Sequence, residues 1–258
     1  RMVRSGRITP ETRAARLAAT TFAVGLGAVA AADLVVEAVF EDMEVKQKLL
    51  AGLEAITRPD CILATNTSYL DIDAMAAGLE RPENVIGLHF FSPAHVMKLL
   101  EIVRARRTAP DVLATAVALG KRLKKIAVVC GVCDGFIGNR IMARYRAQCE
   151  FMLEDGALPH EIDAALEAYG FAMGPFAVQD LAGLDIAWAR RKRLALTRAP
   201  DERYVPIADA LCEAGRFGQK TGKGWYRYED GKRIVDAEVT ALILAHSAAR
   251  GIARRPIE

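Results

Sequence analysis

Apolar, β-branched runs alternate with helical patterns along the first half of the chain. Apolar residues spaced three and four apart predict helices over residues 43–56 and 71–79. The short apolar runs around these helices predict strands at residues 34–39, 61–66 and 84–91. A strand–helix–strand order of this kind predicts a parallel sheet with helices packed on its faces.

A further apolar run, residues 99–103, follows the third predicted strand after a short loop that contains Pro93. This loop is too short to hold the helical crossover that parallel neighbours need. We therefore expect residues 99–103 to pair antiparallel with the strand before them.

The strand signal fades after about residue 131, and the pattern of the second half is helical. It predicts helices at residues 136–153, 159–169, 184–196 and 206–214. Pro159 is well placed as a first helical residue. We expect an α/β domain over residues 1–130 followed by an all-α domain over residues 131–258.

The composition is that of a globular chain from a reducing compartment. Of 258 residues, 35 are Lys or Arg and 32 are Asp or Glu, and the net charge of +3 is too small to predict binding to nucleic acid or to a membrane surface. Five cysteines, an odd number scattered through a long chain, argue against a secreted disulfide framework. The sequence shows no signal peptide and no apolar stretch long enough to span a membrane, so the cytoplasm is the expected compartment.

Cys130 and Cys133 form a C-x-x-C motif, which could be half of a zinc site or a redox pair. No second motif of this kind and no nearby histidine completes it. The sequence therefore predicts no metal site.

Polar residues stand at the carboxyl ends of the three predicted parallel strands. Glu37 and Glu41 follow the first strand, Asn66 to Ser68 the second, and His89 and Ser92 the third. Ligands bind beyond the carboxyl ends of the strands in an open parallel sheet. We therefore expect these side chains to form one site.

His89 and Glu101 each interrupt an apolar run with the pattern of a buried strand. A buried polar group costs free energy unless it has a partner. If the two strands are antiparallel neighbours, the carboxylate can fix the imidazole tautomer and leave the other ring nitrogen as a base. On spacing alone, a purely structural His–Glu pair is an equally good interpretation.

Two further polar residues have both a structural and a functional interpretation. Ser68 stands three residues before Asp71, ahead of a predicted helix, and helix capping alone would explain it. Asp134 is a candidate N-cap, which would place Asn139 in the first turns of the next helix. Asn139 is either a surface residue or, because it stands where the two predicted domains meet, a substrate ligand.

Several separate motifs together resemble the 3-hydroxyacyl-CoA dehydrogenases, and most of all the dehydrogenase part of multifunctional fatty-acid oxidation proteins. They are NTS (66–68), GLHFFSPAHVMKLLEIV (87–103), DGFIGNR (134–140), MGPF (173–176) and FGQKTGKGWYRY (217–228). The resemblance covers essentially the whole chain. It implies an incomplete Rossmann-like, doubly wound sheet followed by a helical domain.

The resemblance also implies an activity, the NAD-dependent oxidation of (3S)-3-hydroxyacyl-CoA to 3-oxoacyl-CoA. It implies His89 as the catalytic base and Glu101 as the carboxylate that orients it. Ser68 and Asn139 match the family's substrate-contacting residues. The positions that touch the cofactor in the family are Glu41, Lys46, Ser68, Ser92 and Lys220. Further implications are an acyl-CoA partner, a homodimer formed through the helical domain, and membership of a multifunctional polypeptide.

The chain departs from this family at its start, where a strand, a G-x-G-x-x-G loop and a helix are expected. Gly25-Leu26-Gly27 resembles that loop only superficially, because the third glycine is missing and the segment precedes a strand. We interpret it as a linker and expect the chain to be a fragment that lacks the pyrophosphate site and binds NAD weakly when isolated. A dehydrogenase for other hydroxy acids and a non-catalytic dimerisation module stay open as alternatives.

Overall fold

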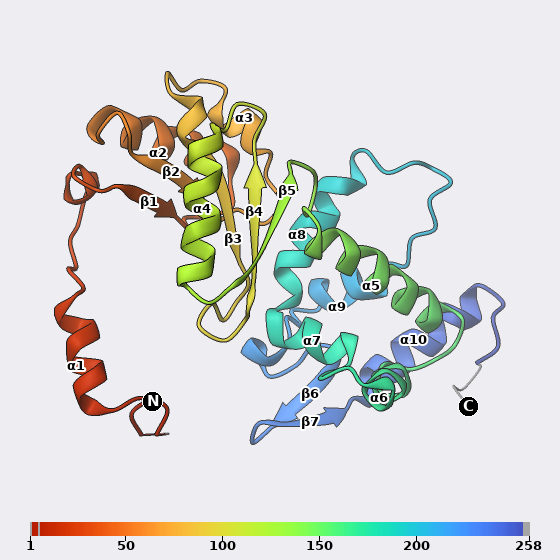
Figure 1. Ribbon diagram of the computed structural model, residues 1–258. Helices are drawn as coiled ribbons and strands as arrows, with labels where there is room; N and C mark the ends of the chain where they lie inside the picture. Colours follow the sequence, from red (N-terminus) through yellow and green to blue (C-terminus); the bar gives the residue numbers. More distant parts are fainter. Residues whose placement is uncertain (1, 5, 255–258) are drawn as a thin grey trace. The chain divides into compact units, whose positions relative to one another are not determined.

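The computed structural model describes residues 2–4 and 6–254. It forms two compact units, Arg1–Arg140 and Ile141–Glu258, which are drawn together in Figure 1. A domain boundary at residue 130 stays a prediction.

The first unit holds a five-stranded sheet with the order β1-β2-β3-β4-β5 (Figure 1). Its strands are β1 (Leu34–Glu37), β2 (Ile62–Thr65), β3 (Val85–Phe90), β4 (Leu99–Arg104) and β5 (Ile126–Gly131). β1, β2 and β3 are parallel, β4 pairs antiparallel with β3, and β5 pairs parallel with β4. The predicted antiparallel pairing is confirmed, and the short connection between β3 and β4 explains it.

Helices cover both faces of this sheet (Figure 1). α2 (Met43–Ile56) and α3 (Ile72–Ala76) contribute to one buried cluster, and α4 (Pro110–Arg122) contributes to another on the opposite face. The predicted helices over residues 43–56 and 71–79 are confirmed in position. A parallel α/β architecture followed by a mainly helical unit is the fold class that the sequence predicts.

The side chains of β3 alternate between the two faces, as the period of a strand requires. Ile86 and Leu88 pack in the cluster of α4, whereas Val85 packs in the cluster of α2 and α3. Gly87 faces α3 so closely that a Cβ there would lie 2.5 Å from Cδ1 of Ile72. His89, two residues further on, therefore lies on the face that α2 and α3 cover.

The described part of the first unit also holds three short elements, two ahead of β1 and one between α3 and β3. α1 (Pro10–Ala18) buries none of its side chains, η1 (Leu26–Val29) is a single 3₁₀ turn, and η2 (Pro82–Asn84) leads into β3. Gly25, with φ 88°, precedes this 3₁₀ turn and not an α-helix. The segment thus lacks the loop-to-helix geometry of a phosphate-binding G-x-G-x-x-G motif, and its interpretation as a linker stays a prediction.

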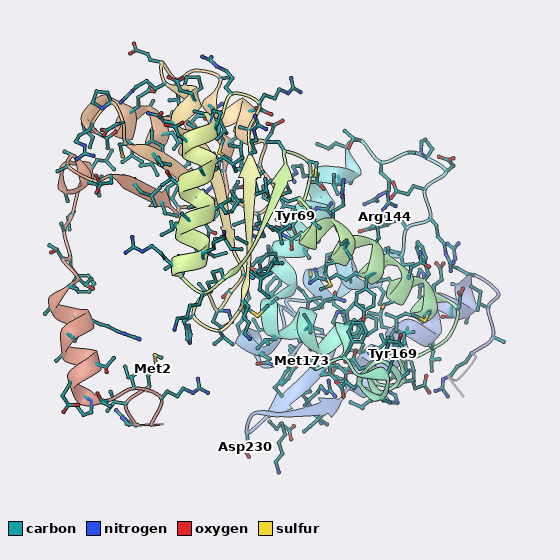
Figure 2. The ribbon with its side chains drawn as sticks, viewed as in Figure 1. Met2, Tyr69, Arg144, Tyr169, Met173 and Asp230 are labelled. Carbon is teal, nitrogen blue, oxygen red and sulfur yellow. The ribbon has the colours of Figure 1, made fainter. Side chains whose placement is uncertain are left out.

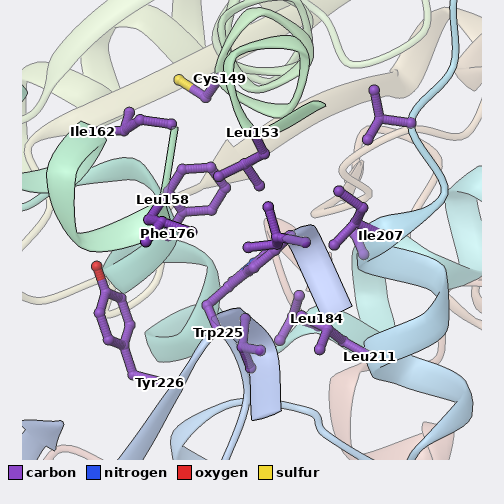
Figure 3. Close-up of a cluster of buried hydrophobic side chains, with 14 of the residues drawn as sticks. Cys149, Leu153, Leu158, Ile162, Phe176, Leu184, Ile207, Leu211, Trp225 and Tyr226 are labelled. Carbon is purple, nitrogen blue, oxygen red and sulfur yellow. The ribbon is translucent and has the colours of Figure 1, made fainter. Parts of the chain in front are cut away.

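The second unit is built from helices around one core. They are α5 (Gly138–Glu154), whose first three residues belong to the first unit, α6 (Pro159–Tyr169), α7 (Pro175–Ala182), α8 (Leu184–Ala195), α9 (Ile207–Glu213), α10 (Ala237–Ala249) and the 3₁₀ helix η3 (Gln219–Thr221). Figure 3 shows the core, in which the rings of Phe176 and Trp225 meet edge to face with centroids 4.8 Å apart. The predicted helices over residues 159–169, 184–196 and 206–214 are confirmed to within a residue or two.

A two-stranded hairpin, β6 (Tyr226–Glu229) and β7 (Lys232–Val235), also belongs to the second unit, and the sequence analysis did not predict it. Its turn is Asp230-Gly231, with φ values of 48° and 76° (Asp230 is labelled in Figure 2). Two positive φ values are typical of a type I′ turn, and Asp-Gly between alternating residues is the signal that could have revealed the hairpin.

No helix in the described part of the chain is long and apolar enough to cross a membrane.

Candidate active site

His89 of β3 and Glu101 of β4 lie directly opposite each other across the antiparallel pair. Nδ1 of His89 and Oε2 of Glu101 are 2.6 Å apart, and both side chains are buried. The structure thus brings together the two polar residues that interrupt the apolar strands.

The second oxygen of Glu101 holds the start of α5. Oε1 accepts hydrogen bonds from the backbone N–H groups of Ile137, at 3.1 Å, and Gly138, at 2.7 Å. Burial raises the pKa of Glu101, but the hydrogen bonds from His89 and from these N–H groups outweigh burial, and the pKa lies below its ordinary value. Glu101 is therefore ionised at neutral pH. Because a carboxylate only accepts, Nδ1 of His89 is the donor, and in the neutral imidazole Nε2 then carries the lone pair.

The expectation that Asp134 caps α5 is wrong. α5 begins at Gly138, and the first N–H groups are held by Glu101 from another element. Gly135 and Phe136 have φ values of 73° and 47°, which are left-handed and incompatible with a helix starting earlier. Asn139 nevertheless lies in the first turn of α5.

Two aromatic rings fix the position of the His89 imidazole. The ring centroid of Phe91 lies 4.4 Å from that of His89, and the centroid of Phe136 lies 5.7 Å away. Gly138 leaves room for this arrangement, since a Cβ there would lie 3.0 Å from Cζ of Phe91. Among residues 2–4 and 6–254, none hydrogen-bonds Nε2 of His89. That nitrogen is available to a ligand.

The loop after β2 brings Ser68 to the same end of the sheet. Oδ1 of Asn66 accepts the backbone N–H of Phe90 at 2.8 Å, a contact that the sequence analysis missed. Nδ2 of Asn139 donates to the backbone oxygen of Ser68 at 3.5 Å, so these two predicted site residues lie close together. Ser68 does not cap α3, because the side chain of Asp71 accepts from Ala74 at that helix start.

Glu37, Glu41 and Lys46 form a charged cluster beside this loop. Nζ of Lys46 lies 2.9 Å from each carboxylate oxygen of Glu37 and 3.6 Å from Oε2 of Glu41. Oε1 of Glu41 accepts from the backbone N–H groups of Ser68, at 2.8 Å, and Tyr69, at 3.1 Å (Tyr69 is labelled in Figure 2). The charged cluster therefore connects the end of β1 to the loop that carries Ser68.

The remaining two predicted cofactor residues stand outside this cluster. Ser92 is exposed in the loop after β3, and no described residue hydrogen-bonds it. Lys220 belongs to η3 of the second unit, where its Nζ pairs with the carboxylate of Asp185.

The cysteines of the C-x-x-C motif, Cys130 and Cys133, are both partly buried. All five cysteines of the chain are free thiols, and burial raises the pKa of Cys130 to about 11. Within the described ranges, no group of three His, Cys, Asp or Glu side chains could hold a metal ion.

Comparison with known families decides the identity of the chain. Residues 1–133 match the family described as 3-hydroxyacyl-CoA dehydrogenase, NAD binding domain, and residues 135–228 match the C-terminal domain of the same enzyme. The chain belongs to the 3-hydroxyacyl-CoA dehydrogenase family. NAD is the cofactor of the domain that the first match describes.

Individual relatives of this 3-hydroxyacyl-CoA dehydrogenase chain agree with the family match. The peroxisomal bifunctional enzyme of Cavia porcellus is 53% identical over 219 residues, which are 81% of this chain and 30% of that protein. The fatty acid oxidation complex subunit alpha of Ectopseudomonas oleovorans is 40% identical over 245 residues, which are 92% of this chain and 34% of that protein. The crystal structure of (S)-3-hydroxybutyryl-CoA dehydrogenase PaaH1 from Ralstonia eutropha has a TM-score of 0.81 at 31% identity, covering 89% of this chain and 82% of that one. The chain thus spans about a third of the length of the curated relatives it matches.

Proposed function

We propose that the chain oxidises (3S)-3-hydroxyacyl-CoA to 3-oxoacyl-CoA with NAD, as a step of fatty-acid β-oxidation, and that His89 is the base. The observation that carries this proposal is the buried His89–Glu101 hydrogen bond of 2.6 Å, which leaves Nε2 of His89 for a substrate. The family match and the names of the relatives supply the substrate class.

The chain's own residues would handle the proton of the reaction. When bound, NAD would supply the acceptor for the hydride that leaves C3 of the substrate. Nε2 of His89 takes the proton of the C3 hydroxyl, which avoids a free alkoxide, and a positioned base of this kind contributes roughly 10²–10⁴ in rate. The Glu101 carboxylate then stabilises the imidazolium that forms.

Ser68 and Asn139 are proposed to hold the substrate oxygens. Their support is the 3.5 Å contact between Asn139 and the backbone oxygen of Ser68, together with a Ser68 hydroxyl that no described residue hydrogen-bonds. Both residues lie at the end of the sheet where β1, β2 and β3 have their carboxyl ends, which is where ligands of such sheets bind.

The residues present fit NAD at this end of the sheet. The Glu41 side chain is 38% exposed, and its Oε2 accepts no hydrogen bond from the described residues, so it can accept one from a cofactor hydroxyl or amide. Glu41, Ser68, Ser92 and Lys220 are proposed as cofactor contacts on the family resemblance. The same resemblance names Lys46, whose ammonium group is already held by Glu37.

The activity of the whole protein is a further proposal, because the chain spans 30% of the length of the Cavia porcellus relative. We propose that it acts as the dehydrogenase part of a multifunctional fatty-acid oxidation protein and forms a homodimer through its second unit. The cytoplasm stays the predicted compartment, supported by five free cysteines, although the Cavia porcellus relative is named as peroxisomal.

The test compares NADH formation from 3-hydroxybutyryl-CoA, from a long-chain 3-hydroxyacyl-CoA and from free hydroxy acids. We expect turnover with at least one CoA thioester and none with the free acids. Turnover confined to free hydroxy acids would replace this proposal with the hydroxy-acid dehydrogenase alternative. No NADH from any substrate, while the chain is folded, would favour the non-catalytic alternative.

A further inference from the structure

We propose that Asp180 of α7 is a positioning residue for Lys220, because its buried carboxylate holds together the two ends of the loop that carries this lysine. The loop is residues 217–224, the first part of the FGQKTGKGWYRY motif, and we call it the lysine loop. The inference rests on the proposed function, in which Lys220 is a cofactor contact. It gives Asp180 and this motif a role that the proposed reaction alone does not assign.

The carboxylate of Asp180 accepts hydrogen bonds from residues that directly follow the lysine loop. Asp180 is 1% exposed, and its Oδ1 accepts the backbone N–H of Trp225 at 2.9 Å. Its Oδ2 accepts the backbone N–H of Tyr226 at 2.9 Å and the hydroxyl of Tyr228 at 3.0 Å (Trp225 and Tyr226 are labelled in Figure 3). Burial raises the pKa of Asp180 to about 6, although these hydrogen bonds act to lower it. The group is therefore mostly ionised at neutral pH and accepts from all three donors.

Two glycines bring both ends of the lysine loop against Asp180. A Cβ on Gly218 would lie 2.3 Å from the backbone oxygen of Asp180, and a Cβ on Gly224 would lie 2.0 Å from its Oδ1. Gly218 also has a φ of 92°, which residues with a side chain rarely adopt. Only glycine fits at either position, and the backbone touches Asp180 at the start and at the end of the loop.

Hydrogen bonds within the lysine loop connect these two ends. Gly218 donates its N–H to the backbone oxygen of Lys223 at 2.8 Å. The Thr221 hydroxyl accepts the N–H of Phe217 at 2.9 Å and donates to the backbone oxygen of Lys223 at 2.9 Å. These bonds join residues on both sides of Lys220, so its backbone position follows from where the two ends are fixed.

Arg216, which directly precedes the lysine loop, is a second link between its ends. Its Nε donates to the backbone oxygen of Gly224 at 3.0 Å. The loop thus keeps one closure when the carboxylate of Asp180 is lost. We therefore expect variants of Asp180 to loosen the lysine loop without detaching it.

The side chain of Lys220 also passes close to the end of α7. Its Nζ pairs with the carboxylate of Asp185, and a Cβ on Gly183, the residue after α7, would lie 3.1 Å from this Nζ. The side chain is 49% exposed, and an ammonium group paired with one carboxylate oxygen has two further donors for an acceptor on the cofactor. The segment that carries Asp180 therefore fixes the backbone of the loop and leaves a path for the side chain.

Asp180→Asn tests the effect on the lysine loop without using turnover. The amide keeps one acceptor oxygen, but its NH₂ group cannot accept the N–H of Trp225 or Tyr226. Thr221 and Gly222 donate their own N–H groups within the loop, at 3.0 and 3.1 Å, so hydrogen exchange at these amides reports how often the loop opens. We expect exchange at both to accelerate by about tenfold, the change expected from losing one hydrogen bond to a charged group. Unchanged exchange, with only a lower melting temperature, would overturn the proposal.

A double-mutant cycle tests whether Asp180 acts through Lys220. Lys220→Met should raise the KM for NAD by about tenfold with a smaller change in kcat, because it removes one charge-assisted contact. Asp180→Asn should also raise this KM, but it should have no further effect when Lys220 is already absent. The KM of the double variant should therefore stay within about twofold of that of Lys220→Met. A rise equal to the product of the two single rises would overturn the proposal.

Asp209→Asn is the matched control for a destabilised second unit. Asp209 belongs to α9, and its Oδ1 lies 2.7 Å from Nε of Arg191. This variant should lower the melting temperature and leave both the exchange of the loop amides and the KM for NAD unchanged. If it accelerates exchange at Thr221 and Gly222 as much as Asp180→Asn does, the effect is general and the proposal is wrong.

Tyr228→Phe keeps the test usable if Asp180→Asn does not fold. It removes one of the three hydrogen bonds to the carboxylate, so exchange at Thr221 and Gly222 should accelerate by about threefold. Unchanged exchange in this variant would count against the proposal in the same way. A wild-type chain that forms no NADH would refute the proposed function, whereas the exchange measurements would still decide whether Asp180 holds the lysine loop.

Discussion

Oδ1 of Asn66 accepts the backbone N–H of Phe90 at 2.8 Å, and this bond joins the end of β2 to the end of β3. Phe90 directly follows His89, and Asn66 stands two residues before Ser68. One side-chain amide therefore sets the spacing between the proposed base and the loop that carries a proposed substrate ligand.

Asn66→Ala should weaken both stability and activity. The variant leaves the Phe90 N–H without its partner, which costs about 1–3 kcal/mol of unfolding free energy. We expect a lower melting temperature and a lower kcat, measured by thermal unfolding and by NADH formation. Asn66→Asp, which keeps an acceptor at this position, is the control and should retain more of both; equal losses in the two variants would contradict a role for the acceptor.

His89→Gln should nearly abolish turnover while leaving NAD binding nearly unchanged. The variant removes the base, so the rate should fall by roughly 10²–10⁴. Steady-state NADH formation measures the loss, and calorimetric titration with NAD checks that cofactor binding is retained. Wild-type turnover in this variant would refute the assignment of His89 as base.

The ionisation of Glu101 should make the unfolding free energy of the first unit depend on pH. Its folded pKa lies below the ordinary value of 4.5, because hydrogen bonds from His89, Gly138 and Ile137 outweigh burial. A group with a depressed folded pKa contributes stability above its unfolded pKa, and that contribution is lost as the pH falls through the folded pKa. The difference in unfolding free energy between the wild type and Glu101→Gln should therefore be constant at neutral pH and shrink below about pH 4.5. Denaturant unfolding at a series of pH values measures it, and a pH-independent difference would count against this account.

Gly87→Ala should destabilise the sheet beside the site. A Cβ at this position would lie 2.5 Å from Cδ1 of Ile72 and 2.7 Å from Cβ of Val103, so β3 would have to move. Overpacking of this kind typically costs about 1–3 kcal/mol. Gly78→Ala is the control, because no atom lies within 4 Å of the added Cβ there. Thermal unfolding of the two variants should differ by several degrees, and equal melting temperatures would show that β3 accommodates the methyl group.

Local patterns were sufficient to predict four of the five strands in the sheet of the first unit, whereas β5 (Ile126–Gly131) was not predicted. The period of the apolar runs located the strands, and the length of the loop before β4 set its direction. Once two strands are known to be antiparallel, the spacing along the chain indicates which residues lie opposite each other. The pairing of His89 with Glu101 could therefore be inferred from the sequence.

Contacts between distant segments could not be read in the same way. Asp134 has the residue type of an N-cap, but the left-handed backbone of Gly135 and Phe136 ends that possibility, and Glu101 holds the helix start from another strand. The role of Asn66 depends on its distance from Phe90, which no local pattern reports. The hairpin of the second unit was missed because helical patterns surround it, although Asp230-Gly231 carries its turn signal.

The two oxygens of Glu101 serve separate segments, one toward the imidazole on β3 and one toward the first amides of α5. A single anion thus fastens the proton-handling ring and the beginning of a long helix at once. A substitution of Glu101 that changes the basicity of the ring would also remove the acceptor of the amides at the start of α5. A second substitution would be needed to supply a new acceptor for those amides.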